Sequence, residues 1–310
     1  MHKKAVMVII LIVVVLSLIT LAFMSPRQSR SGAAKIAVIY VDGIMIGGRG
    51  EAGLLGASGG TDAIIRQLHA AKEDATVKAI LLRINSPGGS APASQEVGEE
   101  IKKVRQSGKI IVTSMADMAA SGGYWLAATT DKIYANPATL TGSIGVYIPY
   151  ANWQELYQKI GIYQEKIKSG PHKDMLAPER SLTPAERAIV QSMVDDLYEQ
   201  FVQVVAQGRN LDPEKVRQLA DGRIYTGNQA KALGLVDELG NMYDALEGAK
   251  QLAGLSGKVE IKEYGEFNPW SLLFGSVKSQ ISLENMLYRQ LRPDTLLTAP
   301  LAMPQEWQVQ

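Results

Sequence analysis

The 310-residue sequence has no cysteine, only three histidines and no marked excess of charge of either sign. The lack of cysteine excludes disulfide bonds, thiolate zinc sites and a cysteine nucleophile. His2, His69 and His172 are scattered along the chain, which argues against a histidine-rich metal site. The formal net charge of +1 gives no basic excess that would favour nucleic acid. We therefore expect neither a metal ion nor a nucleic-acid partner.

One long hydrophobic run lies near the N-terminus. Residues 5–23 contain no charged residue and are rich in Val, Ile and Leu, and a helix of that length just spans a bilayer core. A cleaved signal peptide is the alternative, but residues 22–25 fit its small-x-small cleavage site poorly. The sequence thus predicts an uncleaved single-pass anchor after a short N-terminal side, residues 1–4. The positive-inside bias favours an extracytoplasmic body.

Beyond the anchor, we expect a linker over residues 24–34, one large domain over 35–265 and a C-terminal tail over 266–310. The first half of the domain alternates apolar runs with helix-forming segments, which predicts βαβ units on a mostly parallel sheet. The expected strands are 35–41, 77–84 and 109–114, and the expected helices are 61–72 and 91–105. The fold class is therefore α/β, with functional loops beyond the carboxyl ends of the strands.

The remaining segments have simpler signals. Residues 43–60 are rich in glycine and are expected to form a loop. The second half of the domain is more helical. Capping signals predict helices over 183–207, from 212 and over 226–233.

Ser121 is the candidate nucleophile. It stands between small residues and the start of a helix, so a substrate backbone can approach its hydroxyl closely. The alternative is a serine that merely caps the helix. Acyl transfer also needs donors for an oxyanion, and the backbone N–H groups of Gly88 and Gly122 are the natural pair. Both lie in glycine-rich loops at carboxyl ends of predicted strands.

The residues alone leave the general base open. His172 lies in a loop and fits a Ser–His arrangement, whereas His69 falls in a predicted amphipathic helix. Lys173 is the other candidate. A lysine base must be neutral, and burial is what favours the neutral amine.

Four motifs occur in one order along the chain. They are Asn85-Ser-Pro-Gly-Gly89, Ala119-Ala-Ser-Gly-Gly-Tyr124, Thr141-Gly-Ser-Ile-Gly-Val146 and Lys168-Ser-Gly-x-x-Lys173. Together they resemble the signal peptide peptidase A family of membrane serine proteases, and the resemblance runs from about residue 35 to 238. A lone Ser-Gly-Gly would not be specific, but four ordered motifs are.

The resemblance implies a Ser–Lys dyad on a fold related to Clp proteases and crotonases, with no cofactor. Ser121 matches the nucleophile, Lys173 the general base and Ser143 the hydroxyl that orients the lysine. Gly88 and Gly122 match the oxyanion donors. The histidine next to the lysine then has no catalytic part.

The chain is similar to the short form of this family, in which the lysine can come from a neighbouring subunit. The resemblance therefore implies a ring-like homo-oligomer in the cell membrane that cleaves remnant signal peptides and other hydrophobic peptides. A related membrane protease with a different protein substrate is one alternative. A crotonase-like acyl-CoA enzyme, which would have little use for Ser121, is another, and a non-catalytic membrane scaffold is a third.

Overall fold

The computed structural model describes residues 34–49, 51–53, 56–58 and 60–264. The chain divides into two units, Met1–Gly265 and Glu266–Gln310, and every described residue belongs to the first. The predicted anchor over residues 5–23 and the predicted tail lie outside the described residues. Among the described helices, none combines the length and the apolar character needed to cross a membrane.

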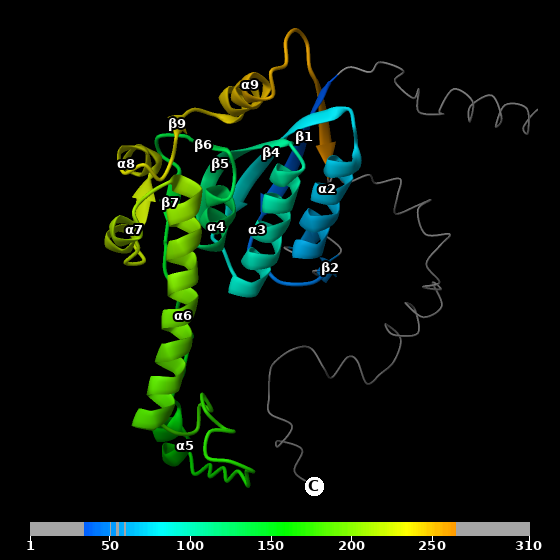
Figure 1. The fold of residues 1–310 in the computed structure, drawn as a ribbon. Helices are drawn as coiled ribbons and strands as arrows, with labels where there is room; N and C mark the ends of the chain where they lie inside the picture. The colour runs from blue at the N-terminus through cyan, green and yellow to red at the C-terminus, as the bar shows by residue number, and fades with distance from the viewer. Residues whose placement is uncertain (1–33, 50, 54–55, 59, 265–310) are drawn as a thin grey trace, which may run out of the picture. The chain divides into compact units, whose positions relative to one another are not determined.

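Eight strands of the described residues form one sheet, whose main path runs β10-β1-β4-β5-β6-β9 (Figure 1). All five neighbouring pairs on this path are parallel. The strands are β1 (Lys35–Asp42), β4 (Val77–Ser86), β5 (Ile110–Ala120), β6 (Lys132–Ala135), β9 (Glu238–Leu239) and β10 (Glu260–Tyr264). The predicted parallel α/β core is confirmed.

Helices cover both faces of this sheet, which explains why its inner strands β1, β4 and β5 contain long apolar runs. Ile36 and Val38 of β1 pack in one core with Leu246 of α9 (Met242–Leu252). The alternate residues Ala37 and Ile39 belong to a larger core on the other face. That second core includes residues of α2 (Thr61–Glu73), α3 (Ala91–Gln106), α4 (Gly122–Ala128) and α6 (Pro184–Arg209).

The third strand predicted from the sequence, β5, is longer than expected. The sequence predicted its end at Ser114, but β5 continues to Ala120. Its outer part pairs in parallel with β7 (Leu140–Gly142), which in turn pairs antiparallel with β8 (Ile224–Thr226). These distant partners extend the strand up to the residue that precedes Ser121.

The glycine-rich segment 43–60 also differs from the prediction of a plain loop. It contains an antiparallel pair, β2 (Glu51–Gly53) and β3 (Gly56–Ser58). Met45 and Ile46 form single bridges to Gly89 and Gly60. The segment is therefore tied to the loop that follows β4.

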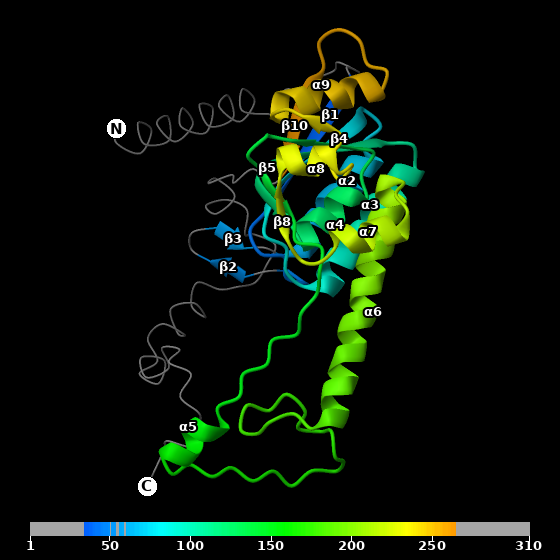
Figure 2. The same ribbon diagram turned by 90° about the vertical axis from the view of Figure 1, so that its left-hand side faces the viewer.

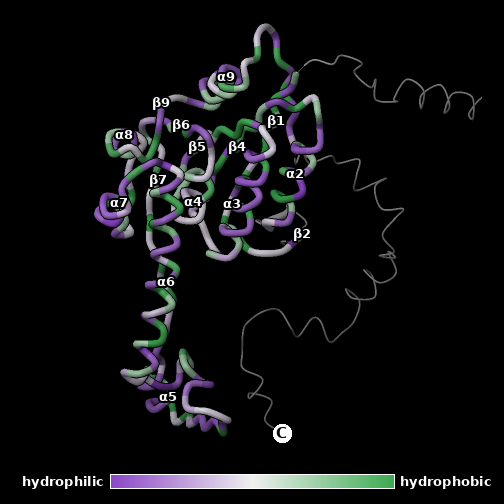
Figure 3. The backbone as a smooth tube through the Cα atoms, viewed as in Figure 1, coloured by the Kyte–Doolittle hydropathy of each residue, from purple (hydrophilic) through white to green (hydrophobic). Residues whose placement is uncertain are grey.

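The helices predicted in the second half are confirmed. α6 starts with the expected capping box, in which the Thr183 side chain and Glu186 satisfy each other's backbone N–H groups. α7 (Pro213–Leu219) and α8 (Gly227–Ala232) begin after their expected cap residues, Asp212 and Thr226. Hydrophobic and hydrophilic residues alternate along α6 in Figure 3.

Only the C-terminal half of α6 packs into the core. Phe201 lies 5.0 Å from Trp125 of α4 between ring centroids, and Gly208 fits against the Ala128 backbone. The fifteen residue steps from Glu186 to Phe201 correspond to about 22 Å of helix. Figures 1 and 2 show α5 (Gln154–Lys159) at the same level as the N-terminal end of α6, away from the sheet.

Replacing Gly208 by Ala should loosen the contact between α6 and α4. The added methyl carbon would lie 1.7 Å from the Ala128 carbonyl oxygen, which is rigid backbone. Overpacking of this kind typically costs about 1–3 kcal/mol. We expect Gly208→Ala to lower the free energy of unfolding by an amount in that range, measured by urea denaturation followed by circular dichroism. Gly47→Ala is the control because its methyl would meet nothing within 4 Å, and equal stability of the two variants would contradict the prediction.

Candidate active site

Ser121 occupies a strained turn between β5 and α4. Its backbone angles are φ 52 and ψ −121, a conformation that a non-glycine residue adopts at an energetic cost. The Ser121 N–H donates to the Gly142 carbonyl at 2.8 Å, and the Ser121 carbonyl accepts from Trp125 N–H at 2.9 Å. The side chain makes no capping hydrogen bond. The alternative of a simple helix cap is therefore not supported.

The loop after β4 touches this turn directly. A Cβ on Gly88 would lie 2.5 Å from the Gly122 nitrogen and 2.7 Å from the Ser121 Cβ. Gly88 also has φ +97, which L side chains rarely adopt. Both facts require glycine here, and the structure brings Gly88, Gly122 and Ser121 together as the sequence predicted.

Gly122 is equally confined. A Cβ at this position would lie 2.3 Å from the hydroxyl oxygen of buried Ser94, which itself donates to the Ser90 carbonyl. As the first residue of α4, Gly122 has no acceptor for its N–H within the helix. The Gly88 N–H, in contrast, donates to Ser86 Oγ at 3.0 Å. Gly88 could serve an oxyanion only by sharing or exchanging that bond.

Ser143 lies beside Ser121 through strand register. Ala120 of β5 pairs with Gly142 of β7, so each serine directly follows one member of this pair. Ser143 also has a positive φ, 51, and its N–H donates to the Arg223 carbonyl at 2.8 Å. Neighbouring strands lie about 4.8 Å apart, which places the two serine backbones next to each other.

Lys173 is not brought to Ser121 within one chain. It is exposed in the loop before α6, and the next residue, Asp174, is linked through Arg180 to Glu186 in the first turn of α6. Ser121 begins the helix that contacts α6 near Phe201, at the other end of the 22 Å of helix described above. Ser121 and its three predicted neighbours, Gly88, Gly122 and Ser143, therefore assemble, and the predicted base does not join them.

The two histidines considered as bases are also accounted for. His172 shares the loop of Lys173, and its Nδ1 lies 3.8 Å from Glu186 Oε1. His69 Nε2 lies 2.6 Å from Glu100 Oε2, which links α2 to α3. Neither position favours a Ser–His arrangement in one chain.

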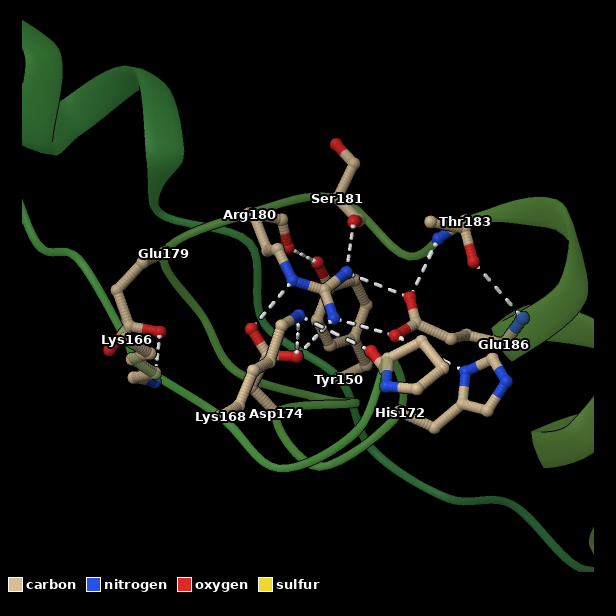
Figure 4. A network of polar contacts seen from close by, with 11 residues as sticks. Tyr150, Lys166, Lys168, His172, Asp174, Glu179, Arg180, Ser181, Thr183 and Glu186 are labelled. Carbon is tan, nitrogen blue, oxygen red and sulfur yellow. Dashed lines mark hydrogen bonds and ion pairs between the residues drawn. The ribbon is translucent and has the colours of Figure 1, made fainter.

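A polar network holds the loop that carries Lys173 (Figure 4). The Arg180 guanidinium donates to Asp174 at 2.7 and 3.0 Å, and to Glu186 at 2.6 and 2.7 Å. Lys168 Nζ also donates to Asp174, at 2.6 Å. The capping box made Glu186 visible in the sequence, but no sequence signal pointed to Arg180 because its partners lie six residues away on either side.

These ion pairs lower the pKa of both carboxyl groups. Arg180, with help from the Thr183 N–H, lowers the pKa of Glu186 to about 2. Arg180 and then Lys168 hold the pKa of Asp174 well below its usual range. The stabilisation from such groups is present above the unfolded pKa and is lost only as pH falls through the folded value. Both carboxylates therefore stay charged at neutral and alkaline pH.

Comparison with known proteins identifies the family. Residues 103–256 match the family model described as peptidase family S49. A Synechocystis sp. protein named "Putative protease" is 46% identical over 206 residues, which cover 66% of this chain and 74% of that protein. The chain belongs to peptidase family S49.

Other S49 relatives agree with this assignment. An Enterococcus faecium protein named "Putative signal peptide peptidase SppA" is 44% identical, and the match covers 60% of this chain and 54% of that protein. Protease 4 from Salmonella typhi is 38% identical, with 71% and 35% covered. The matched part of the chain thus spans about half of one relative and about a third of the other. The prediction of a serine protease is confirmed, and the acyl-CoA enzyme and scaffold alternatives are wrong.

A solved structure shares the fold. It is a serine-to-alanine mutant of a membrane-bound stomatin-specific protease, with a TM-score of 0.51 and 14% sequence identity. The match covers 76% of this chain and 99% of the other. At this identity the likeness supports the α/β protease fold of the S49 chain and nothing finer.

The fit between Gly122 and Ser94 can be tested by a rescue experiment. Gly122→Ala should lower peptidase activity at least about tenfold, because its methyl collides with Ser94 Oγ and displaces the turn of Ser121. Removing that oxygen in Gly122→Ala/Ser94→Ala leaves the next atoms at 3.4 Å, an ordinary contact distance. We expect the double variant to regain most of the activity in a peptide-cleavage assay. Ser94→Ala alone is the control, and equal loss in the single and double Gly122 variants would refute the steric explanation.

Proposed function

We propose that this S49 protease is a membrane-anchored endopeptidase that hydrolyses remnant signal peptides and other hydrophobic peptides through a Ser121–Lys173 dyad. The observation that carries the proposal is the strained turn of Ser121. Its side chain makes no capping hydrogen bond, and its close neighbours are Gly88 and Gly122. A serine held in this way is exposed to a substrate and close to N–H donors, which is what acyl transfer requires.

The proposed reaction uses only groups of the protein and water. Neutral Lys173 takes the proton of Ser121 as its hydroxyl oxygen attacks the scissile carbonyl. The N–H groups of Gly88 and Gly122 stabilise the oxyanion, and one such donor is worth roughly 3 kcal/mol in comparable sites. The Gly88 N–H contributes only as it shares or exchanges its bond to Ser86 Oγ. The lysine ammonium then protonates the leaving amine, and water hydrolyses the acyl-enzyme. Ser143, beside Ser121, would accept or donate the hydrogen bond that orients the lysine.

We infer that Lys173 serves the serine of a neighbouring protomer. The arm, defined here as residues 147–183, carries Lys173 and exposes several large apolar side chains. These are Tyr147, Trp153, Leu156, Ile160, Tyr163 and Ile167. A cluster of this kind usually marks an interaction surface, and a second copy of the chain would bring the missing base. Burial at such a contact also favours a neutral lysine.

Two features support hydrophobic peptide substrates at the membrane. Ile44 and Ile46, 60% and 53% exposed, flank Met45, whose N–H donates to the Gly88 carbonyl at 2.8 Å. They therefore offer apolar surface close to the nucleophile. The predicted anchor over residues 5–23 would hold this site at the cell membrane, with the body extracytoplasmic. The name of the Enterococcus relative, a signal peptide peptidase, agrees with such substrates.

The shared dyad predicts complementation between two inactive variants. Ser121→Ala and Lys173→Ala should each abolish cleavage of a quenched signal-peptide substrate, since each removes one member of the dyad. Co-assembly in equal amounts should restore about a quarter of the wild-type activity, because random mixing in a head-to-tail ring gives that fraction of complete sites. Lys215→Ala, an exposed lysine of α7, is the control.

The outcomes separate the parts of the proposal. Activity that survives in Ser121→Ala would refute the nucleophile assignment. Loss in both variants without complementation, while light scattering shows mixed assemblies, would refute the shared dyad. Cleavage of folded membrane proteins in preference to signal peptides would refute the proposed substrate class.

A lysine base also fixes the sign of the pH dependence. The base works only when deprotonated, so kcat/KM should rise with pH on the alkaline side of neutrality. The carboxylates near Lys173 have lowered pKa values and do not titrate in that range. A rate profile of the assembled enzyme from pH 5 to 10 tests this, and a maximum in mild acid would exclude the dyad.

A further inference from the structure

We propose that Arg180 is a positioning residue, which acts through Asp174 to hold Lys173 in place. This inference rests on the proposed function, because it assumes that Lys173 is the base. Arg180 lies between two carboxylates that belong to different structural elements (Figure 4). One is Asp174, the residue after Lys173, and the other is Glu186 in the first turn of α6.

The contact with the lysine loop is two-pronged. Arg180 Nε and Nη2 donate to the two oxygens of Asp174 at 3.0 and 2.7 Å. A bidentate pair of this kind fixes orientation as well as distance. Lys168 Nζ closes the loop from the other direction, donating to Asp174 and to the Pro171 carbonyl at 2.6 and 3.2 Å. Lys173 thus lies in a short loop whose two flanks meet at one carboxylate.

The other contact ties the same guanidinium to a rigid helix. Nη1 and Nη2 donate to Glu186 at 2.7 and 2.6 Å. Glu186 is only 1% exposed and also accepts the Thr183 N–H at 2.9 Å. The Tyr150 hydroxyl donates to the Arg180 carbonyl, which fixes the backbone of the arginine as well. Arg180 therefore transmits the position of α6 to the loop of Lys173.

The charges around this arginine balance. Asp174 and Glu186 face Arg180, Lys168 faces Asp174, and His172 lies beside Glu186. Lys166 and Glu179 form a separate pair nearby (Figure 4). Removing the guanidinium leaves one uncompensated negative charge next to Lys173, whereas neutralising Asp174 leaves one extra positive charge. The two changes should therefore favour the lysine ammonium and the neutral amine, respectively.

These opposite signs distinguish positioning from a merely structural role. In the assembled full-length enzyme, we expect Arg180→Met to lower kcat by about 10- to 100-fold, the range that small misplacements of a catalytic group cause. KM should stay within about twofold because substrate pockets are not touched. The alkaline midpoint of the rate profile should move to higher pH in Arg180→Met and to lower pH in Asp174→Asn. Arg180→Lys keeps the positive charge but loses the bidentate geometry of the guanidinium, so its kcat should lie between those of Arg180→Met and the wild type.

Arg217→Met is the matched control. Arg217 also links two carboxylates, Glu199 of α6 and Glu214 of α7, but it lies toward the other end of α6. Its loss should leave kcat and the midpoint unchanged. Light scattering on every variant checks assembly. If Arg180→Met fails to assemble, the kcat and the alkaline midpoint of Asp174→Asn decide whether the positioning role holds.

Specific results would overturn the inference. Wild-type kcat and an unmoved midpoint in Arg180→Met, or in Asp174→Asn where that variant decides, would remove the positioning role. That result, together with inactive Ser121→Ala and Lys173→Ala, would leave the proposed function intact. Activity in Lys173→Ala would instead remove the proposed function itself.

Discussion

The structure of the candidate site depends on one close contact between backbones. The loop after β4 and the turn after β5 approach so tightly that a methyl group on Gly88 would lie 2.5 Å from the Gly122 nitrogen. This contact needs two parallel neighbouring strands that end at the same edge of the sheet. It also needs a serine backbone with positive φ, held by hydrogen bonds to Gly142 and Trp125. The strain at Ser121 is sustained by the packed core around it.

A second level of organisation is the extension of β5 by β7. The pairing of Ala120 with Gly142 sets Ser121 and Ser143 side by side, although the two residues are distant enough in sequence to belong to separate motifs. A slip of one residue in this register would turn every side chain of β7 to the opposite face. The antiparallel strand β8 holds β7 from its other edge and so protects that register.

The sequence was a good guide where signals are local. The apolar runs of β1 and β4 and the capping box at Thr183 located their elements within a few residues. It failed for the end of β5, because residues 118–120 pair with β7, a distant segment that no local signal indicates. At the site, the glycines and Ser121 were identifiable from their motifs. Arg180 was not, since a bridging arginine is defined by where two carboxylates meet in space.

The length of α6 has a consequence for the number of complete active sites in an assembly of protomers. One end of this helix packs on the helix that follows Ser121, and the other end holds the loop of Lys173. Under the proposed sharing, each protomer gives away one lysine and receives another. An open row of protomers would then leave a serine without a base at one end and a lysine without a serine at the other. Only a closed ring would make every subunit productive.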